Sequence, residues 1–144
     1  MSPTLARPIT PPPASPRVRA PAEPRCSGGV QLGGSAGTFR SGPANKRYCS
    51  WQDCMWHVAL DTDDIIVLKF TRLDIECVTN PQGVPYDYAK VYDGVTVASP
   101  LLATFFCSTH YAVATSGPHL LLHFHTDELY NYFGFEAIYK SGRS

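Results

Sequence analysis

The 144-residue chain is long enough for one domain with a short tail. Apolar residues make up 44% and charged residues 17%, and no apolar run approaches the roughly 20 residues of a transmembrane helix. The formal net charge is zero, but four arginines and one glutamate give residues 1–25 a charge of +3, which leaves −3 for the rest. The sequence therefore excludes a transmembrane segment in this chain and gives no indication of a nucleic-acid partner.

Residues 1–25 contain eight prolines and no apolar stretch of the kind found in a secretory signal. We predict a disordered Pro/Arg-rich linker here. Either the sequence is a fragment of a larger secreted or membrane-anchored protein, or its start is misassigned. We favour the fragment.

After Arg25, short apolar runs alternate with turn signals, and no segment keeps a helical period for three turns. Residues 66–70 and 73–75 alternate apolar and polar side chains in two different phases, which predicts a bulge at Thr71-Arg72. Further strands are expected at 37–40, 54–60, 88–92, 112–115, 120–124 and 133–139. Many short strands separated by turns predict an all-β fold, either a sandwich or a barrel.

The chain holds five cysteines, at Cys26, Cys49, Cys54, Cys77 and Cys107. None forms C-x-x-C, and none has histidines at zinc-finger spacing. In a β-rich domain this pattern favours disulfides and an oxidising compartment, hence an extracellular or cell-surface location, with one thiol left over. The alternative is a cytosolic protein with buried free cysteines.

From Cys26 to Tyr139, short motifs follow one another in a fixed order. They are Cys26-Ser-Gly-Gly, Gly37-Thr-Phe-Arg-Ser41, Cys54-Met-Trp56-His-Val58, Tyr86-Asp87-Tyr88, Val91-Tyr92-Asp93-Gly94, Phe106-Cys107, Thr115-Ser116-Gly117, Phe124-x-Thr126-Asp127 and Gly134-Phe135-x-Ala137-x-Tyr139. In this order and spacing the chain resembles a CUB domain. The stretch ATSGPHLLLHFHTDELYNYFGF is most similar to the CUB domain of attractin-type proteins.

The resemblance implies a jelly-roll-like, two-sheet β-sandwich over residues 26–144. It also implies a non-catalytic, extracellular module that binds protein partners. Large aromatic side chains would fill the space between the two sheets, namely Trp56, Phe70, Phe124 and Phe135.

The resemblance implies two disulfides as well. The first is Cys26–Cys54, with Cys49 as a rival partner for Cys26, and the second is Cys77–Cys107. The family usually places its third cysteine two residues before the Tyr-Asp pair, whereas here Val84-Pro85 stands there and Cys77 lies upstream. The inserted residues 78–84 put the second disulfide in question and predict a mobile loop.

Many CUB domains bind calcium at one end of the sandwich, and the matching acids here are Glu76, Asp87 and Asp127. Calcium prefers carboxylate oxygens, and three clustered acids would repel one another without a cation. The alternative is three ordinary solvated loop acids. In the family, such a site receives a lysine or arginine from a protein partner. The predicted rim of the binding site is Tyr86, Tyr130 and Asn131, although Tyr130 stands where the family often has Asn.

Two histidines offer a different kind of site. His123, His125 and Asp127 are two residues apart, so on a strand they would share a face and could hold zinc or copper. The ordinary interpretation is a solvent-facing surface of the sheet. A small β-barrel metalloenzyme that uses His123 and His125 is therefore the alternative function. The sequence contains no catalytic signature with the right context, so we expect no catalytic residues.

Overall fold

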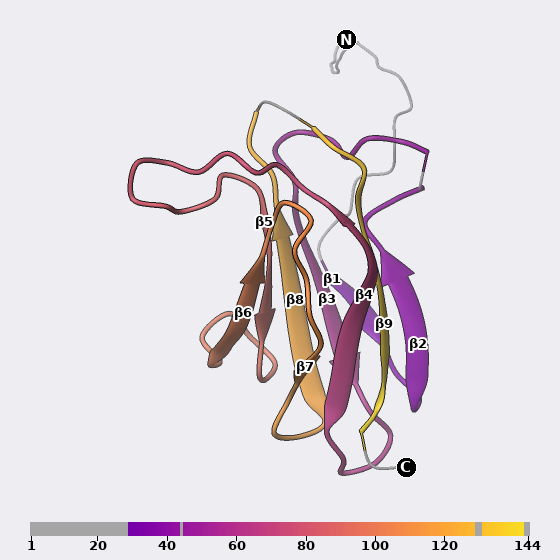
Figure 1. The fold of residues 1–144 in the computed structure, drawn as a ribbon. Helices are drawn as coiled ribbons and strands as arrows, with labels where there is room; N and C mark the ends of the chain where they lie inside the picture. The colour runs from indigo at the N-terminus through magenta and orange to yellow at the C-terminus, as the bar shows by residue number, and fades with distance from the viewer. Residues whose placement is uncertain (1–28, 44, 129–130, 143–144) are drawn as a thin grey trace, which may run out of the picture.

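The computed structural model describes residues 29–43, 45–128 and 131–142, and these residues form nine strands and no helix (Figure 1). The strands are β1 (Gly29–Leu32), β2 (Ala36–Arg40), β3 (Asp53–Ala59), β4 (Ile66–Asp74), β5 (Tyr88–Tyr92), β6 (Leu101–Phe105), β7 (Val113–Ala114), β8 (His119–His125) and β9 (Gly134–Ser141). They pair into a five-stranded sheet, β1-β3-β8-β5-β6, and a four-stranded sheet, β2-β9-β4-β7. Within these residues, nothing has the helical length and apolar character needed to cross a membrane. The predicted all-β sandwich is confirmed, and the predicted linker at 1–25 lies outside the described residues.

Seven of the nine strands match a predicted segment to within two residues at each end. The predicted bulge is also present, because the register between β4 and β9 shifts between Phe70 and Arg72. The sequence does not predict β1 or β6, since their short segments lack a clear alternation of apolar and polar residues. β1 extends the five-stranded sheet by pairing in parallel with β3, and β6 forms its other edge beside β5.

Aromatic rings fill the space between the sheets, as predicted. The ring of Phe135 lies 5.3 Å from Trp56, 5.4 Å from Phe124 and 5.7 Å from Phe70, in edge-to-face arrangements. All four side chains are buried. Such contacts stabilise a core beyond the area that they bury, typically by about 0.5–1.5 kcal/mol per pair. This rigid core fixes the strand ends from which the loops emerge.

β9 begins at Gly134, where the backbone conformation favours glycine. Its φ is 86°, and a Cβ at this position would collide with the Ser41 hydroxyl oxygen. The Ser41 hydroxyl instead accepts a hydrogen bond from the Phe135 N–H at 3.0 Å. This close approach joins the end of β2 to the start of β9.

The second predicted disulfide is present, because Cys77 and Cys107 are bonded with Cα atoms 4.3 Å apart. The inserted residues 78–84 project from the sandwich (Figure 1), and the Asn80 side chain accepts hydrogen bonds from the N–H groups of Gln82 and Val84. Cys54 also takes part in a disulfide. Cys26 lies outside the described residues, so its pairing with Cys54 stays a prediction, as does the role of Cys49 as the odd thiol.

Candidate functional site

Three acidic side chains meet at one end of the sandwich. Glu76 follows the end of β4, Asp87 directly precedes β5, and Asp127 follows the end of β8. These strand ends lie together at the end of the molecule drawn at the top in Figure 1. One carboxylate oxygen from each residue lies within 4.8 Å of the other two. The structure thus brings together the three acids that the sequence predicts, and we call this group the acidic edge.

The acidic edge places two carboxyl groups out of contact with solvent, since the exposed fraction is 1% for Glu76 and 0% for Asp87. Burial, followed by the nearby charges of Asp87 and Asp127, raises the pKa of Glu76 to about 7. Burial also raises the pKa of Asp87 to about 6, although the hydrogen bonds from the Tyr48 hydroxyl and the Asp127 N–H act in the opposite direction. A bound cation would remove both the repulsion and the cost of the buried charge.

Hydrogen bonds orient Asp87 from two sides. The Tyr48 hydroxyl donates to Oδ2 at 2.6 Å, and the Asp127 N–H donates to Oδ1 at 2.8 Å. The Tyr48 oxygen also accepts from the Glu76 N–H at 3.2 Å. Tyr48 therefore ties two of the acids together, and the sequence analysis missed it because its loop carries no motif.

Glu76 places one carboxylate oxygen within 4.8 Å of an oxygen of Asp87 and of Asp127. Its Oε1 atom is buried and has no hydrogen-bond partner among the described residues. Buried polar atoms are nearly always satisfied in folded proteins, so an orphaned carboxylate oxygen beside two other carboxylates indicates a missing partner. The donor set consists of oxygens, which suits a hard cation such as calcium.

The chain matches the CUB domain family over residues 26–139, which is most of its length. The chain belongs to the CUB family. Cubilin from Sus scrofa is 35% identical over 114 residues, which are 77% of this chain and 3% of cubilin. The chain therefore spans only a small part of this relative.

Solved CUB domains share the fold. The CUB2 domain of MASP-1 bound to Ca2+ superposes with a TM-score of 0.66 at 22% identity, covering 78% of this chain and 97% of that one. The full extracellular region of zebrafish Gpr126/Adgrg6 gives a TM-score of 0.66 at 24% identity, covering 81% of this chain and 15% of that one. The narrower likeness to attractin-type proteins stays a prediction.

The predicted rim of the CUB domain is described in part. Tyr86 is 41% exposed and directly precedes Asp87. Asn131 is half-buried, with its side chain hydrogen-bonded to Ser50 and its carbonyl accepting from Arg47 at 2.8 Å. Tyr130 lies outside the described residues.

Trp51 is an exposed residue beside the acidic edge that the sequence analysis missed. Its side chain is 65% exposed, its φ is 57°, and its N–H donates to the Asp127 carbonyl at 3.1 Å. A left-handed backbone is unusual for a bulky residue and persists where the surrounding structure holds it, often at functional sites. An exposed tryptophan beside the acidic edge offers a large apolar contact surface.

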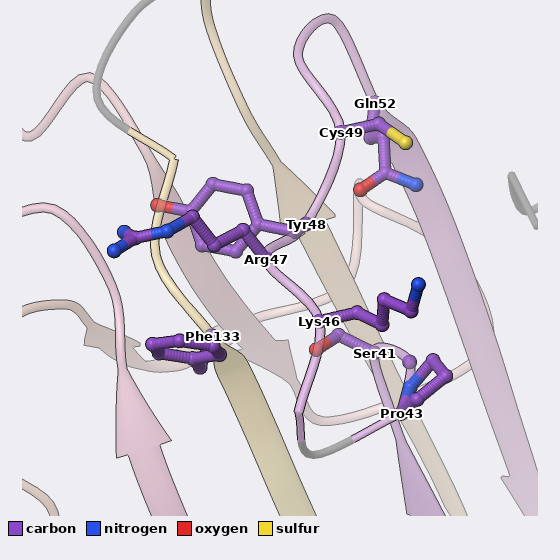
Figure 2. Close-up of a pocket in the computed structure, with 9 residues that line it drawn as sticks. Ser41, Pro43, Lys46, Arg47, Tyr48, Cys49, Gln52 and Phe133 are labelled. Atoms are coloured by element: carbon purple, nitrogen blue, oxygen red, sulfur yellow. The ribbon is translucent and has the colours of Figure 1, made fainter. Parts of the chain in front are cut away.

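A small hollow lies in the segment between β2 and β3 (Figure 2). Its lining includes Ser41, Lys46, Cys49, Gln52 and Phe133. The Arg47 guanidinium lies over the Phe133 ring, 4.9 Å from its centroid. The charged side chains that line this hollow, Lys46 and Arg47, are basic, in contrast to the carboxylates of the acidic edge. Tyr48 itself lines the hollow, so the hollow lies within the segment that presents Tyr48 to the acidic edge.

The alternative that places His123, His125 and Asp127 on one strand face is wrong, because Asp127 groups with Glu76 and Asp87. β8 ends at His125, and the buried Thr126 hydroxyl accepts from the Gln52 N–H at 2.8 Å and donates to the Cys49 carbonyl at 2.8 Å. This anchor turns the chain, so Asp127 joins the acidic edge. The carboxylate beside the two histidines belongs to Asp53 at the start of β3.

Proposed function

We propose that this CUB domain is a non-catalytic protein-binding module of an extracellular protein, and that it binds calcium through Glu76, Asp87 and Asp127. The observation that carries the proposal is the buried, unpartnered Glu76 Oε1 within a group of three carboxylates. The Ca2+-bound CUB2 domain of MASP-1, which shares the fold, supports the choice of ion. The alternative of a small β-barrel metalloenzyme is not favoured, because the chain is a CUB sandwich.

Calcium suits this edge for electrostatic reasons. It takes 6–8 oxygen ligands, so backbone carbonyls and water would complete the shell around the three carboxylates. The ion would neutralise a group whose buried charges repel one another. We expect weak affinity, about 10⁻⁴–10⁻³ M, as in other extracellular modules.

We propose further that the calcium-held carboxylates receive a lysine or arginine from a protein partner. A fixed carboxylate makes a strong charge-assisted hydrogen bond with such a side chain. The exposed rings of Tyr86 and Trp51 would supply apolar contact around it. Tyr130 and Asn131 complete the proposed rim.

Calcium binding is tested by thermal melts with calcium or chelator. At millimolar calcium the expected gain in unfolding free energy is up to about 1.5 kcal/mol. Asp87→Ala should abolish the gain, whereas Asp61→Ala, an exposed acid in the loop between β3 and β4, should preserve it. If calcium leaves the wild-type midpoint unchanged, the acidic edge is not a calcium site.

The basic-side-chain proposal is tested by selecting displayed random peptides on the calcium-saturated domain. Selected peptides should share a lysine or arginine and should dissociate in chelator. Acetylating that lysine should abolish binding, and so should Asp87→Ala in the domain. Peptides that lack a basic residue, or that bind equally well in chelator, would contradict this part of the proposal.

The remaining disulfide proposal is a Cys26–Cys54 bond, which the CUB pattern and the bonded state of Cys54 support. Peptide mapping under non-reducing conditions should recover these two cysteines in one linked fragment. A Cys49–Cys54 fragment would contradict it.

A further inference from the structure

Two histidines and one aspartate meet on the outer face of the five-stranded sheet, away from the core. In the β3–β8 register Asp53 pairs with His125 and Met55 pairs with His123, so the three polar side chains lie on one face. His123 Nε2 and His125 Nδ1 each lie 2.8 Å from the same oxygen, Asp53 Oδ1. We call Asp53, His123 and His125 the His–Asp cluster.

Neighbouring side chains hold both imidazole rings in place. Tyr88 on β5 stacks against His125 with ring centroids 5.1 Å apart and meets His123 edge-on at 5.8 Å. The Lys90 ammonium lies over the Tyr88 ring, 4.5 Å from its centroid. The side chains of His123 and His125 are 14% and 29% exposed, and that of Asp53 is 59% exposed. The cluster is therefore both ordered by its neighbours and reachable from solvent.

We propose that the His–Asp cluster binds one divalent transition-metal ion of the zinc class. Two imidazole nitrogens and one carboxylate oxygen form a ligand set that such ions prefer, and the three ligand atoms lie within 4.8 Å of one another. To bind the ion, each neutral imidazole would carry its hydrogen on the other ring nitrogen, which frees the nitrogen that now faces Asp53 Oδ1. With ligand bonds of about 2.0–2.2 Å, the three atoms need to separate only slightly from their present hydrogen-bond distances.

This site differs from the acidic edge in both chemistry and geometry. Calcium takes oxygen ligands, whereas imidazole nitrogen selects zinc, copper and nickel. Three protein ligands leave a fourth position open, which water would fill in the isolated domain. The proposal concerns binding only and holds whether or not the acidic edge binds calcium.

The same face carries an internal control. His57 Nε2 lies 3.1 Å from His119 Nδ1, and His57 Nδ1 lies 2.9 Å from the Gln31 side-chain oxygen. The two rings stack with centroids 5.2 Å apart. This pair also offers two imidazoles, but its third group is a neutral amide in place of a carboxylate. It should therefore bind zinc far more weakly than the His–Asp cluster.

The experiment is a calorimetric titration of the calcium-saturated domain with zinc chloride. Wild type should bind one equivalent, and His123→Gln, His125→Gln or Asp53→Asn should each weaken binding at least tenfold. His57→Gln and Asp61→Ala, a change of an exposed acid outside both sites, should leave zinc binding unchanged. Absence of saturable binding in wild type would overturn the proposal, and so would a full equivalent retained in the His123→Gln/His125→Gln double variant.

A measurement on the unmodified protein avoids any effect of the substitutions on folding. One equivalent of zinc should shift the ring nitrogen resonances of His123 and His125 in NMR spectra. The resonances of His57 and His119 should stay in place. Shifts confined to His57 and His119, or spread equally over all four rings, would also overturn the proposal.

Discussion

The acidic edge and the His–Asp cluster lie at the same end of the domain, yet they balance their charges in opposite ways. In the acidic edge three carboxylates crowd together, and Glu76 Oε1 has no hydrogen-bond partner among the described residues. In the His–Asp cluster one carboxylate accepts hydrogen bonds from two imidazoles. In the acidic edge, within the described part of the chain, the Glu76 Oε1 atom lacks a hydrogen bond, whereas the Asp53 oxygen of the His–Asp cluster accepts one from each imidazole.

The pKa of a carboxyl group shifts upward in the acidic edge and downward in the His–Asp cluster. Burial is the main cause that raises the pKa of Glu76 to about 7. Partial burial also acts to raise the pKa of Asp53, but the hydrogen bonds from His125 and His123 outweigh it, so the pKa of Asp53 is lowered. We therefore expect the stability of the fold to depend on the state of the acidic edge much more than on that of the His–Asp cluster.

The largest effect is expected from Tyr48→Phe. This change removes the donor to Asp87 Oδ2 and the acceptor of the Glu76 N–H, both of which are buried. In chelator the unfolding free energy should fall by about 3 kcal/mol, because unsatisfied buried groups, charged ones above all, are costly. Urea unfolding measures this, with Tyr92→Phe on the outer face as the control. Equal losses in the two variants would show that the Tyr48 hydroxyl does not support the acidic edge.

Glu76→Gln should change the unfolding free energy in the opposite direction. It keeps the shape of the side chain and removes a buried charge, so it should stabilise the calcium-free domain at pH 8 by on the order of 2 kcal/mol. The same variant should lose the gain that calcium gives to wild type. Glu128→Gln, an exposed acid near the same edge, should change neither quantity. A calcium-free Glu76→Gln domain that is less stable than wild type would contradict the proposed repulsion.

The pH dependence follows from the raised pKa of Glu76. The folded state holds this proton more tightly than the unfolded chain, so the stabilising contribution is fully present below the ordinary value of 4.5 and is lost as the pH rises through about 7. In chelator the unfolding free energy of wild type should fall relative to that of Glu76→Gln across this range, by on the order of 2 kcal/mol. Urea unfolding at several pH values measures the difference between the two proteins. A constant difference would contradict the raised pKa.

The sequence predicts the strands better than it predicts the partners within each site. Alternating apolar residues identify β4 and β8, because period-two patterns reflect which side chains face the core. The acids at 76, 87 and 127 were found through family motifs. Tyr48 was not found, because its contact with Asp87 depends on how two loops pack. The same limit explains Asp53, which meets the two histidines through the β3–β8 register.

The smallest expected effect belongs to Asp53→Asn. Its side chain is 59% exposed, and exposed charged pairs contribute little to folding, so the unfolding free energy should change by no more than about 0.5 kcal/mol. The asparagine oxygen can still accept hydrogen bonds from the imidazoles, but an amide is a poorer zinc ligand than a carboxylate. Urea unfolding of this variant should therefore show near wild-type stability. Zinc titration of the same preparation should show weakened zinc binding. A loss of several kcal/mol would show that the His–Asp cluster supports the fold as the acidic edge does.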